Sequence, residues 1–450
     1  MKNIIGIRRE DLDKRGEQRV AIIPEDVQNF SDKGFRFLVQ PSIHPQSLDR
    51  KRAFQDETYI EGGATVEESL ENADVIFGLK EVKPAHLIPE KTYLFFSHTH
   101  KGQVKNRPLL QAMVDKKITL MDYELMVDSE KRRLLTAFTY IAGNAGIIDS
   151  LWTLGKRLTQ RGIENPFSEI PQAIHTQNLQ EVKDILFRVN QKIKSEGTPV
   201  EIPPVIIAIC GNGKTSAGVQ ELLEFLPTED ITIDQLSDIY ENGSRQKIYQ
   251  LVMDIPQMYR PQEAFQQEFQ GAGDAQLMNA YFEAPTKFES NLDHVFPYVT
   301  CLLNCILWAP QFPRLITRAQ AKTWYAKHQT LQVIGDVTCD PDGAIQFSAE
   351  TWIDDPVFIY HPATDQSTNG FEGEGIAVMA VTNLPCEFSA DASARFSSEL
   401  KPYLPAIFLA DYQADTIEEA SLPPEIKGAT ILWKGNFTSP YAYMQEYLNS

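Results

Sequence analysis

The sequence of 450 residues lacks any apolar run of 18 residues, the length that a membrane-spanning helix requires. Its first residues, MKNIIGIRRE, join a short amphipathic strand to charges and lack the continuous apolar stretch of a signal peptide. Internal repeats and low-complexity tracts are also missing. We therefore expect a soluble, cytoplasmic protein with two or three domains.

Cysteine and positive charge are both scarce. The 42 basic and 61 acidic residues give a net charge of -19, which argues against a nucleic-acid or anionic-membrane partner. The five cysteines lie in separate apolar segments and suit a reducing compartment. Cys301 and Cys305 could share a helix face, but no second Cys/His pair completes a metal site, so we predict burial and no metal.

Short apolar runs alternate with stretches of helical period, which predicts an α/β fold with parallel sheets. Strands are expected in the first third of the chain at 3–7, 35–40, 73–79, 93–96 and 118–122. Further strands are expected at 205–209, 331–336 and 375–381.

Helices are expected at 24–33, 136–161, 216–226, 296–308 and 391–409. The second of these is rich in small residues, which favours close packing against another helix or a sheet. The polar segment 227–290 is expected to contain an insertion or a flexible part.

Polar residues follow the predicted carboxyl ends of the first strands, the edge where parallel sheets bind ligands. Taken one at a time, each is more often a solvated loop charge, but their convergence on one edge favours an active site. They are Arg9, Arg19, Lys80, His98, Lys101, Asp122 and Glu124.

The segment 203–226, PPVIIAICGNGKTSAGVQELLEFL, joins a buried strand to a helix through Gly211, Asn212 and Gly213. This order places backbone N–H groups and a helix N-terminus beside a bound phosphate. It predicts a dinucleotide-binding βαβ unit, with Gly218 as a helix-packing glycine; an ordinary tight turn is the alternative. Although Gly213-Lys214-Thr215 looks like the end of a P-loop, position 208 is alanine and the preceding residues form a strand, so we reject an NTPase.

Several motifs distributed along the chain match one family: GIRRE, YLFFSHTHKGQ, LMDYE, AGNAGIID, FPYVTCLLNCILW, PRLITR and GDVTCDPDGAIQF. Through them the chain resembles the lysine–2-oxoglutarate reductases, which are NADP-dependent, lysine-forming saccharopine dehydrogenases. It is more distantly similar to alanine dehydrogenases. The resemblance implies two Rossmann-like domains, with a dinucleotide-binding domain (138–384) inserted between the two parts (1–137 and 385–450) of the substrate domain.

The implied reaction condenses L-lysine with 2-oxoglutarate and reduces the imine with NADPH to saccharopine, in lysine degradation. A related amino-acid or imine dehydrogenase, or a catalytically silent cofactor-binding homologue, is the alternative. NADPH is expected from the family's habit, with NAD as the other choice. We expect only small-molecule substrates as partners and leave a homo-oligomer open.

The resemblance also implies roles for single residues. Lys80 and His98 match an acid–base pair, and Glu124 an acidic residue that contacts substrate or tunes that pair. Substrate carboxylates are expected on Arg9, Arg19, Lys101 and Arg133, with Arg132 as a rival because the alignment there shifts by one residue. Asp122 is expected to be structural, and His100 to lie near the site without acting in catalysis.

On the cofactor side, the pyrophosphate is expected on Gly211, Asn212, Gly213 and Lys214, and the nicotinamide pocket on Asn304 and Asp336. Lys214 departs from the family's pattern and could add a cation for phosphate or point to solvent. We expect the segment 234–247, with Asp234, Ser244, Arg245 and Lys247, to decide between NADP and NAD.

Overall fold

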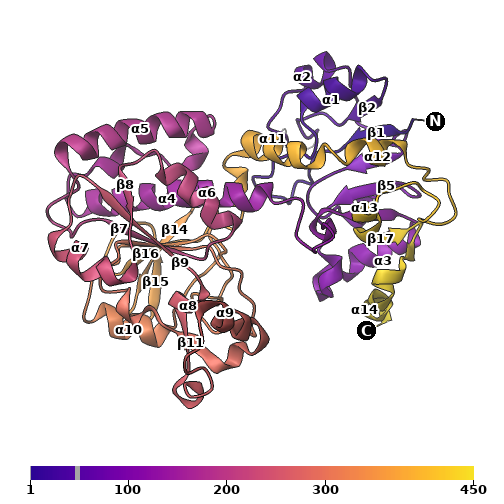
Figure 1. Ribbon diagram of the computed structural model, residues 1–450. Helices are drawn as coiled ribbons and strands as arrows, with labels where there is room; N and C mark the ends of the chain where they lie inside the picture. The colour runs from indigo at the N-terminus through magenta and orange to yellow at the C-terminus, as the bar shows by residue number, and fades with distance from the viewer. Residues whose placement is uncertain (1, 46–50, 450) are drawn as a thin grey trace. The chain divides into compact units, whose positions relative to one another are not determined.

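The protein forms two compact units, described here from a computed structural model that covers residues 2–45 and 51–449 (Figure 1). The first unit consists of Met1–Phe138 and Ser389–Ser450, and the second of Thr139–Phe388. The predicted domain boundaries stood at 137/138 and 384/385. In the described residues, no helix has both the length and the apolar character that a membrane crossing needs.

The first unit contains an eight-stranded sheet in the order β18-β17-β6-β5-β4-β1-β2-β3. The five predicted strands are parallel, as expected, and β3 joins them in parallel. Strand β17 pairs antiparallel with β6, and the edge strand β18 pairs antiparallel with β17. The strands are β1 (Ile4–Ile7), β2 (Arg36–Val39), β3 (Thr65–Val66), β4 (Val75–Phe77), β5 (Thr92–Phe95), β6 (Thr119–Asp122), β17 (Thr430–Trp433) and β18 (Asn436–Phe437).

Helices cover both faces of this sheet, because alternate strand residues point to opposite sides. One face packs against α1 (Pro24–Ser31), α11 (Ser389–Leu400), α12 (Leu404–Leu409) and α13 (Pro424–Gly428). The other face packs against α3 (Arg107–Asp115). The unit also contains α2 (Asp56–Glu61) and α14 (Gln445–Asn449).

Phe408 of α12 lies at the centre of the first face. Its ring centroid is 5.1 Å from that of Phe30, 5.7 Å from Phe37 and 6.0 Å from Phe77. The single helix predicted at 391–409 is two helices, since Pro402 has no backbone N–H to continue α11. The C-terminal segment thus completes the core of the N-terminal sheet.

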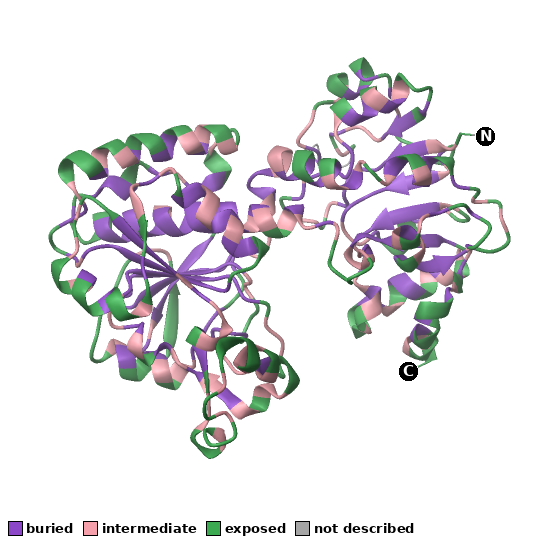
Figure 2. Ribbon diagram, viewed as in Figure 1, coloured by how far each residue is buried: buried purple, intermediate pink, exposed green. Residues whose placement is uncertain are grey.

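The second unit contains an eight-stranded sheet in the order β15-β14-β16-β13-β12-β7-β9-β8. Six strands are parallel, and β14 and β15 form an antiparallel edge. Figure 2 shows the central strands buried. The strands are β7 (Ile206–Cys210), β8 (Thr228–Asp230), β9 (Ile248–Met253), β12 (Cys301–Asn304), β13 (Val333–Asp336), β14 (Val357–His361), β15 (Gln366–Asn369) and β16 (Ile376–Met379).

The helix predicted at 296–308 is wrong. Its centre is β12, which lies between β7 and β13 and is buried along its whole length. A short apolar run buried on both sides carries no period that separates a strand from a helix. Cys301 and Cys305 therefore share no helix face, although both are buried as predicted. The described residues contain no cluster of three His, Cys, Asp or Glu side chains suited to a metal ion.

The polar segment 227–290 is largely ordered secondary structure. It supplies β8 and β9 to the main sheet, and Tyr259, Tyr281 and Phe288 join the hydrophobic core. It also contains α7 (Leu236–Asn242), α8 (Ile255–Met258), α9 (Asp274–Glu283) and the antiparallel pair β10 (Tyr259–Pro261) and β11 (Phe288–Ser290).

Two glycines allow α4 (Ala137–Gln160) and α6 (Lys214–Leu223) to touch through their backbones. A Cβ added at Gly143 would lie 2.0 Å from the carbonyl oxygen of Thr215, and one at Gly218 would lie 2.1 Å from that of Tyr140. The predicted packing role of Gly218 is therefore confirmed. The remaining helices of this unit are α5 (Leu179–Glu196) and α10 (Arg318–Tyr325).

Candidate active site

A buried glutamate ties the loop after β1 to the end of β4. Glu10 accepts hydrogen bonds from the backbone N–H groups of Leu79 (2.8 Å) and Lys80 (2.9 Å). Burial raises the pKa of Glu10, and the Arg8 guanidinium at 3.7 Å opposes that rise. The two hydrogen bonds fix the backbone from which the Lys80 side chain extends.

A buried ion pair lies close to Lys80. Arg19 donates from Nε (2.8 Å) and Nη2 (2.6 Å) to the carboxylate of Glu17, and its guanidinium also stacks 4.2 Å from the ring centroid of Phe138. Burial opposes ionisation of Glu17, but Arg19 and then Lys80 outweigh it and lower the pKa of Glu17 to about 2. Glu17 is thus an anion at neutral pH, placed to attract the Lys80 ammonium. Of the predicted carboxylate-binding arginines, Arg19 already holds a carboxylate of the protein itself.

A carboxylate in the loop after β4 holds the imidazole of His98. Its Nδ1 lies 2.5 Å from Oε1 of Glu81, whose other oxygen accepts from Lys14 Nζ at 2.7 Å. The His98 backbone is left-handed (φ 51°), and its carbonyl accepts from Asn106 Nδ2. Burial would raise the pKa of Glu81, but its hydrogen bonds to His98 and Lys14 hold it well below the usual range. An ionised Glu81 assigns the proton of the neutral ring to Nδ1 and leaves Nε2 to exchange protons with a ligand.

Glu124, after β6, gathers three cationic or titratable side chains. Arg133 Nη2 lies 2.9 Å and Lys101 Nζ 3.0 Å from Oε1, and His100 Nε2 lies 3.7 Å from Oε2. Burial acts to raise the pKa of Glu124, but Lys101 and Arg133 outweigh burial, so the pKa lies below its usual value. Arg132 instead pairs with Asp128 (2.8 Å) and Glu130 (2.9 Å). Of the two rival arginines, the structure therefore places Arg133 in this cluster.

Asp122 joins the ends of β5 and β6. It is fully buried and accepts hydrogen bonds from Ser97 N (2.9 Å), Ser97 Oγ (2.6 Å) and Glu124 N (2.9 Å). Burial raises its pKa despite these bonds. The carboxyl group fixes the two loops that carry His98 and Glu124, as a structural residue would.

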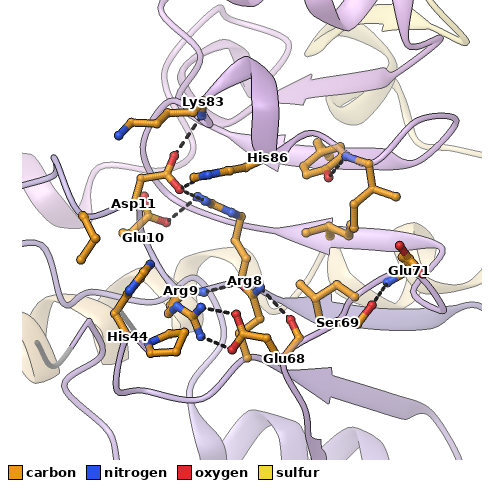
Figure 3. Close-up of a pocket in the computed structure, with 17 residues that line it drawn as sticks. Arg8, Arg9, Glu10, Asp11, His44, Glu68, Ser69, Glu71, Lys83 and His86 are labelled. Atoms are coloured by element: carbon orange, nitrogen blue, oxygen red, sulfur yellow. Dashed lines mark hydrogen bonds and ion pairs between the residues drawn. The ribbon is translucent and has the colours of Figure 1, made fainter. Parts of the chain in front are cut away.

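Arg9 lies in a separate pocket of about 460 Å³, shown in Figure 3. Both of its terminal nitrogens bond to Glu68, and its neighbour Arg8 pairs with Asp11 at 2.7 Å. Lys80, His98 and Glu124 do not line this pocket. The structure thus brings Arg9 together with Glu68, and not with the predicted acid–base residues.

In the second unit, the glycine turn fits the phosphates of a dinucleotide. Gly211 has a φ of +102°, and a Cβ there would lie 3.1 Å from Ile306 Cγ2, so the turn requires glycine. A Cβ at Gly213 would meet nothing within 4 Å, which leaves that side open. Asn212, Gly213 and Lys214 are exposed, and no described residue accepts a hydrogen bond from the N–H groups of the first two. Since α6 begins at Lys214, these donors lie at the positive end of its dipole, which suits a pyrophosphate.

Asn304 and Asp336 end neighbouring strands at the same edge as the glycine turn. Asn304 pairs in register with Cys210 on one side and with Asp336 on the other. Its Nδ2 donates to Asp336 Oδ1 (2.7 Å) and to Thr338 Oγ1 (2.9 Å). Asn304 is the last residue of β12 and does not lie in the predicted helix 296–308.

Sequence reasoning assigned no role to the acidic residues that orient the predicted pair. Glu10, Glu17 and Glu81 lie in loops, where no periodicity marks a buried side chain. Glu81 did carry one signal, since it directly follows Lys80 at a predicted strand end. Glu10 and Glu81 contact residues that are distant in the sequence, and Glu17 contacts Arg19 only because their loop folds back.

The two parallel-dominated sheets, with polar and glycine-rich loops at their carboxyl edges, define a two-domain α/β class. Residues 6–145 match the family described as "Alanine dehydrogenase/PNT, N-terminal domain". An L-alanine dehydrogenase structure aligns with a TM-score of 0.61 over 99% of both chains at 16% identity, which shows the shared fold. The N-terminal third of the chain is thus similar to this family, and the chain as a whole has the fold of an L-alanine dehydrogenase.

In sequence, the chain is similar to α-aminoadipic semialdehyde synthases. The Arabidopsis thaliana protein of that name is 30% identical over 98% of this chain and 41% of its own length. The mitochondrial protein from Bos taurus is 30% identical over 99% of this chain and 48% of its own length. The chain thus spans less than half of these curated relatives. A saccharopine dehydrogenase [NAD(+), L-lysine-forming] from Emericella nidulans is 24% identical over 89% of this chain and 91% of its length.

Proposed function

We propose that the protein is an oxidoreductase of lysine degradation, which joins lysine to 2-oxoglutarate and reduces the resulting imine to saccharopine. The observation that carries the proposal is the group of Lys80 and His98 on adjacent strand ends, each oriented by a buried or half-buried carboxylate. The names of the relatives support the same pathway.

The chemistry needs groups that move protons at neutral pH. The lysine ε-amine must lose a proton before it attacks the keto carbon, and the resulting hydroxyl must gain one before it leaves as water. His98 is suited to both transfers through Nε2, because Glu81 holds its other nitrogen. A positioned acid–base group contributes a factor of about 10² to 10⁴ in rate.

Lys80 and the Glu124 cluster have different tasks. The Lys80 ammonium, beside anionic Glu17, can donate a proton or hold a substrate oxygen. Arg133 and Lys101 can turn from Glu124 toward a substrate carboxylate, since both are partly exposed. A reduced nicotinamide dinucleotide, which the glycine turn and Lys214 would hold by its phosphates, supplies the hydride when bound.

The test is oxidation of reduced dinucleotide by the purified chain with lysine plus 2-oxoglutarate. We expect oxidation that requires both substrates and yields saccharopine by mass spectrometry. His98→Gln and Glu81→Gln should lower turnover by about 100-fold and about 10-fold, since the first removes the acid–base group and the second only its orientation. His86→Gln is the matched control, because His86 is half exposed and pairs with Asp11.

Absence of lysine-dependent oxidation at millimolar substrate would overturn the proposal. Oxidation with ammonia and a keto acid in place of lysine would instead indicate an amino-acid dehydrogenase. Unchanged turnover in His98→Gln would show that the acid–base assignment is wrong.

A further inference from the structure

The order of strands in the second unit differs from the order along the chain. After β7 and α6 the chain enters β8, but the strand that pairs with β7 is β9, and β8 lies one strand further out. Met253, the last residue of β9, lies opposite Cys210, and its carbonyl accepts a hydrogen bond from Gly211 N at 2.8 Å. The carboxyl end of β9 therefore touches the glycine turn.

The residue just beyond this contact is Asp254. In dinucleotide-binding sheets, the side chain after the strand next to the first one meets the adenosine ribose, and an acidic residue there holds the 2′-hydroxyl. It usually comes about 20 residues after the glycines. Here β8 and α7 are interposed, so Asp254 follows Gly211 by 43 residues (254 − 211). It reaches the ribose-binding position because β9, and not β8, pairs with β7.

Asp254 is held in position by hydrogen bonds with the first turn of α8. Its Oδ1 accepts from Ile255 N at 2.8 Å, and its own N–H donates to Gln257 Oε1 at 2.6 Å. The side chain is partly exposed, and no described Lys, Arg or His forms an ion pair with it. Its carboxylate thus keeps acceptor capacity for a ligand hydroxyl.

The basic residues nearest to β9 in the sequence are engaged elsewhere. Arg245 donates to the carbonyl oxygens of Pro199 and Ile202 and, with Lys247, precedes β9, at the opposite end of the strand from the glycine turn. Lys247 pairs with Glu229. Arg260, the next basic residue after Asp254, pairs with Glu289 (2.9 Å) and Asp293 (3.5 Å).

We infer that this chain selects NAD(H) over NADP(H), and that Asp254 is the residue that determines the choice. Its carboxylate accepts hydrogen bonds from the ribose hydroxyls and repels the charge of a 2′-phosphate. The inference rests on the proposed nicotinamide-dependent function and replaces the preference for NADP that resemblance had suggested. The inference moves the choice away from the segment 234–247, which follows β8, contains α7 and ends at the amino end of β9.

The test is equilibrium binding of NADH and NADPH to the full chain by titration calorimetry, without lysine or 2-oxoglutarate. We expect NADH to bind at least tenfold more tightly, since a hydrogen bond to a charged acceptor corresponds to about 10- to 100-fold in affinity. Asp254→Asn should reduce this ratio at least fivefold while keeping the helix cap, because Asn caps as well as Asp. Asp234→Asn is the matched control and should leave the ratio unchanged.

Equal binding of the two dinucleotides, or tighter binding of NADPH, would overturn the inference and leave the proposed function intact. An unchanged ratio in Asp254→Asn would remove Asp254 from the selection. If neither NADH nor NADPH binds, both this inference and the proposed cofactor are overturned. Tight NADH binding without lysine-dependent turnover would support the selection and refute only the proposed reaction.

Discussion

A pair of buried carboxyl groups in the second unit should make its stability depend on pH. Asp149 Oδ1 accepts from Ala173 N at 2.8 Å, and Glu387 Oε2 accepts from Ile174 N at 2.9 Å. The two side chains also hydrogen-bond each other, and their remaining oxygens have no other partner in the described residues. Two carboxyl groups can form such a bond only when one of them carries a proton.

The shared proton sets the sign and size of the effect. Burial raises the pKa of Asp149 from 3.8 to about 6, and burial together with Asp149 raises the pKa of Glu387. Because the folded protein holds a proton that the unfolded chain releases above about pH 4, unfolding becomes easier as pH rises through 6. Two pH units correspond to on the order of 3 kcal/mol, which is roughly 6–12 °C in Tm for a unit of this size.

The variant Glu387→Gln tests this directly. Its amide can donate to an ionised Asp149 and its oxygen can still accept from Ile174 N, so the proton is no longer needed. Between about pH 4 and pH 8, the Tm of the wild-type protein should fall several degrees more than that of Glu387→Gln, measured by differential scanning calorimetry. Glu372→Gln, at an exposed site, should follow the wild type. Equal slopes for wild type and Glu387→Gln would refute the shared proton.

Two further predictions concern packing and substrate binding. Gly218→Ala should lower the free energy of unfolding by about 1–3 kcal/mol or more in denaturant titrations, because its Cβ would meet the Tyr140 carbonyl at 2.1 Å. Gly428→Ala should leave the free energy of unfolding unchanged, because a Cβ there meets nothing within 4 Å. Equal losses in the two variants would contradict the contact. Arg133→Gln should raise the KM of the keto acid by about 10- to 100-fold, whereas Arg132→Gln should change it less than about twofold. The reverse order in steady-state kinetics would assign the carboxylate to Arg132.

The fold could be predicted where the local sequence pattern of an element identifies it as a strand or a helix. The strands at Ile4–Ile7, Thr119–Asp122 and Ile206–Cys210 are short apolar runs with polar ends, and α4 has a long helical period. The β12 strand could not be recognised, because burial on both faces removes the period of two. The sequence of the antiparallel strand β17 carries no sign of its direction, since direction is set by the partner strand.

The site shows the same division. The strand-end positions of Lys80, His98 and Glu124 follow from the parallel sheet, so they could be predicted. The partners Glu81 and Glu17 could not, because their contacts depend on loop conformation. Asp254 is the clearest case, since its position beside the glycine turn depends on β9 passing inside β8.

The division of the first unit between two distant segments has a consequence for synthesis. Strands β1, β2 and β4 present Ile5, Phe37 and Phe77 to a face whose cover includes Phe408. Phe408 emerges 331 residues after Phe77 (408 − 77), which at ribosomal rates is roughly 15–70 s later. During that interval the whole of the second unit is made and can fold, while the first sheet keeps an apolar face exposed. The nascent chain therefore passes through a stage in which the later domain is finished and the earlier one is still open to chaperones.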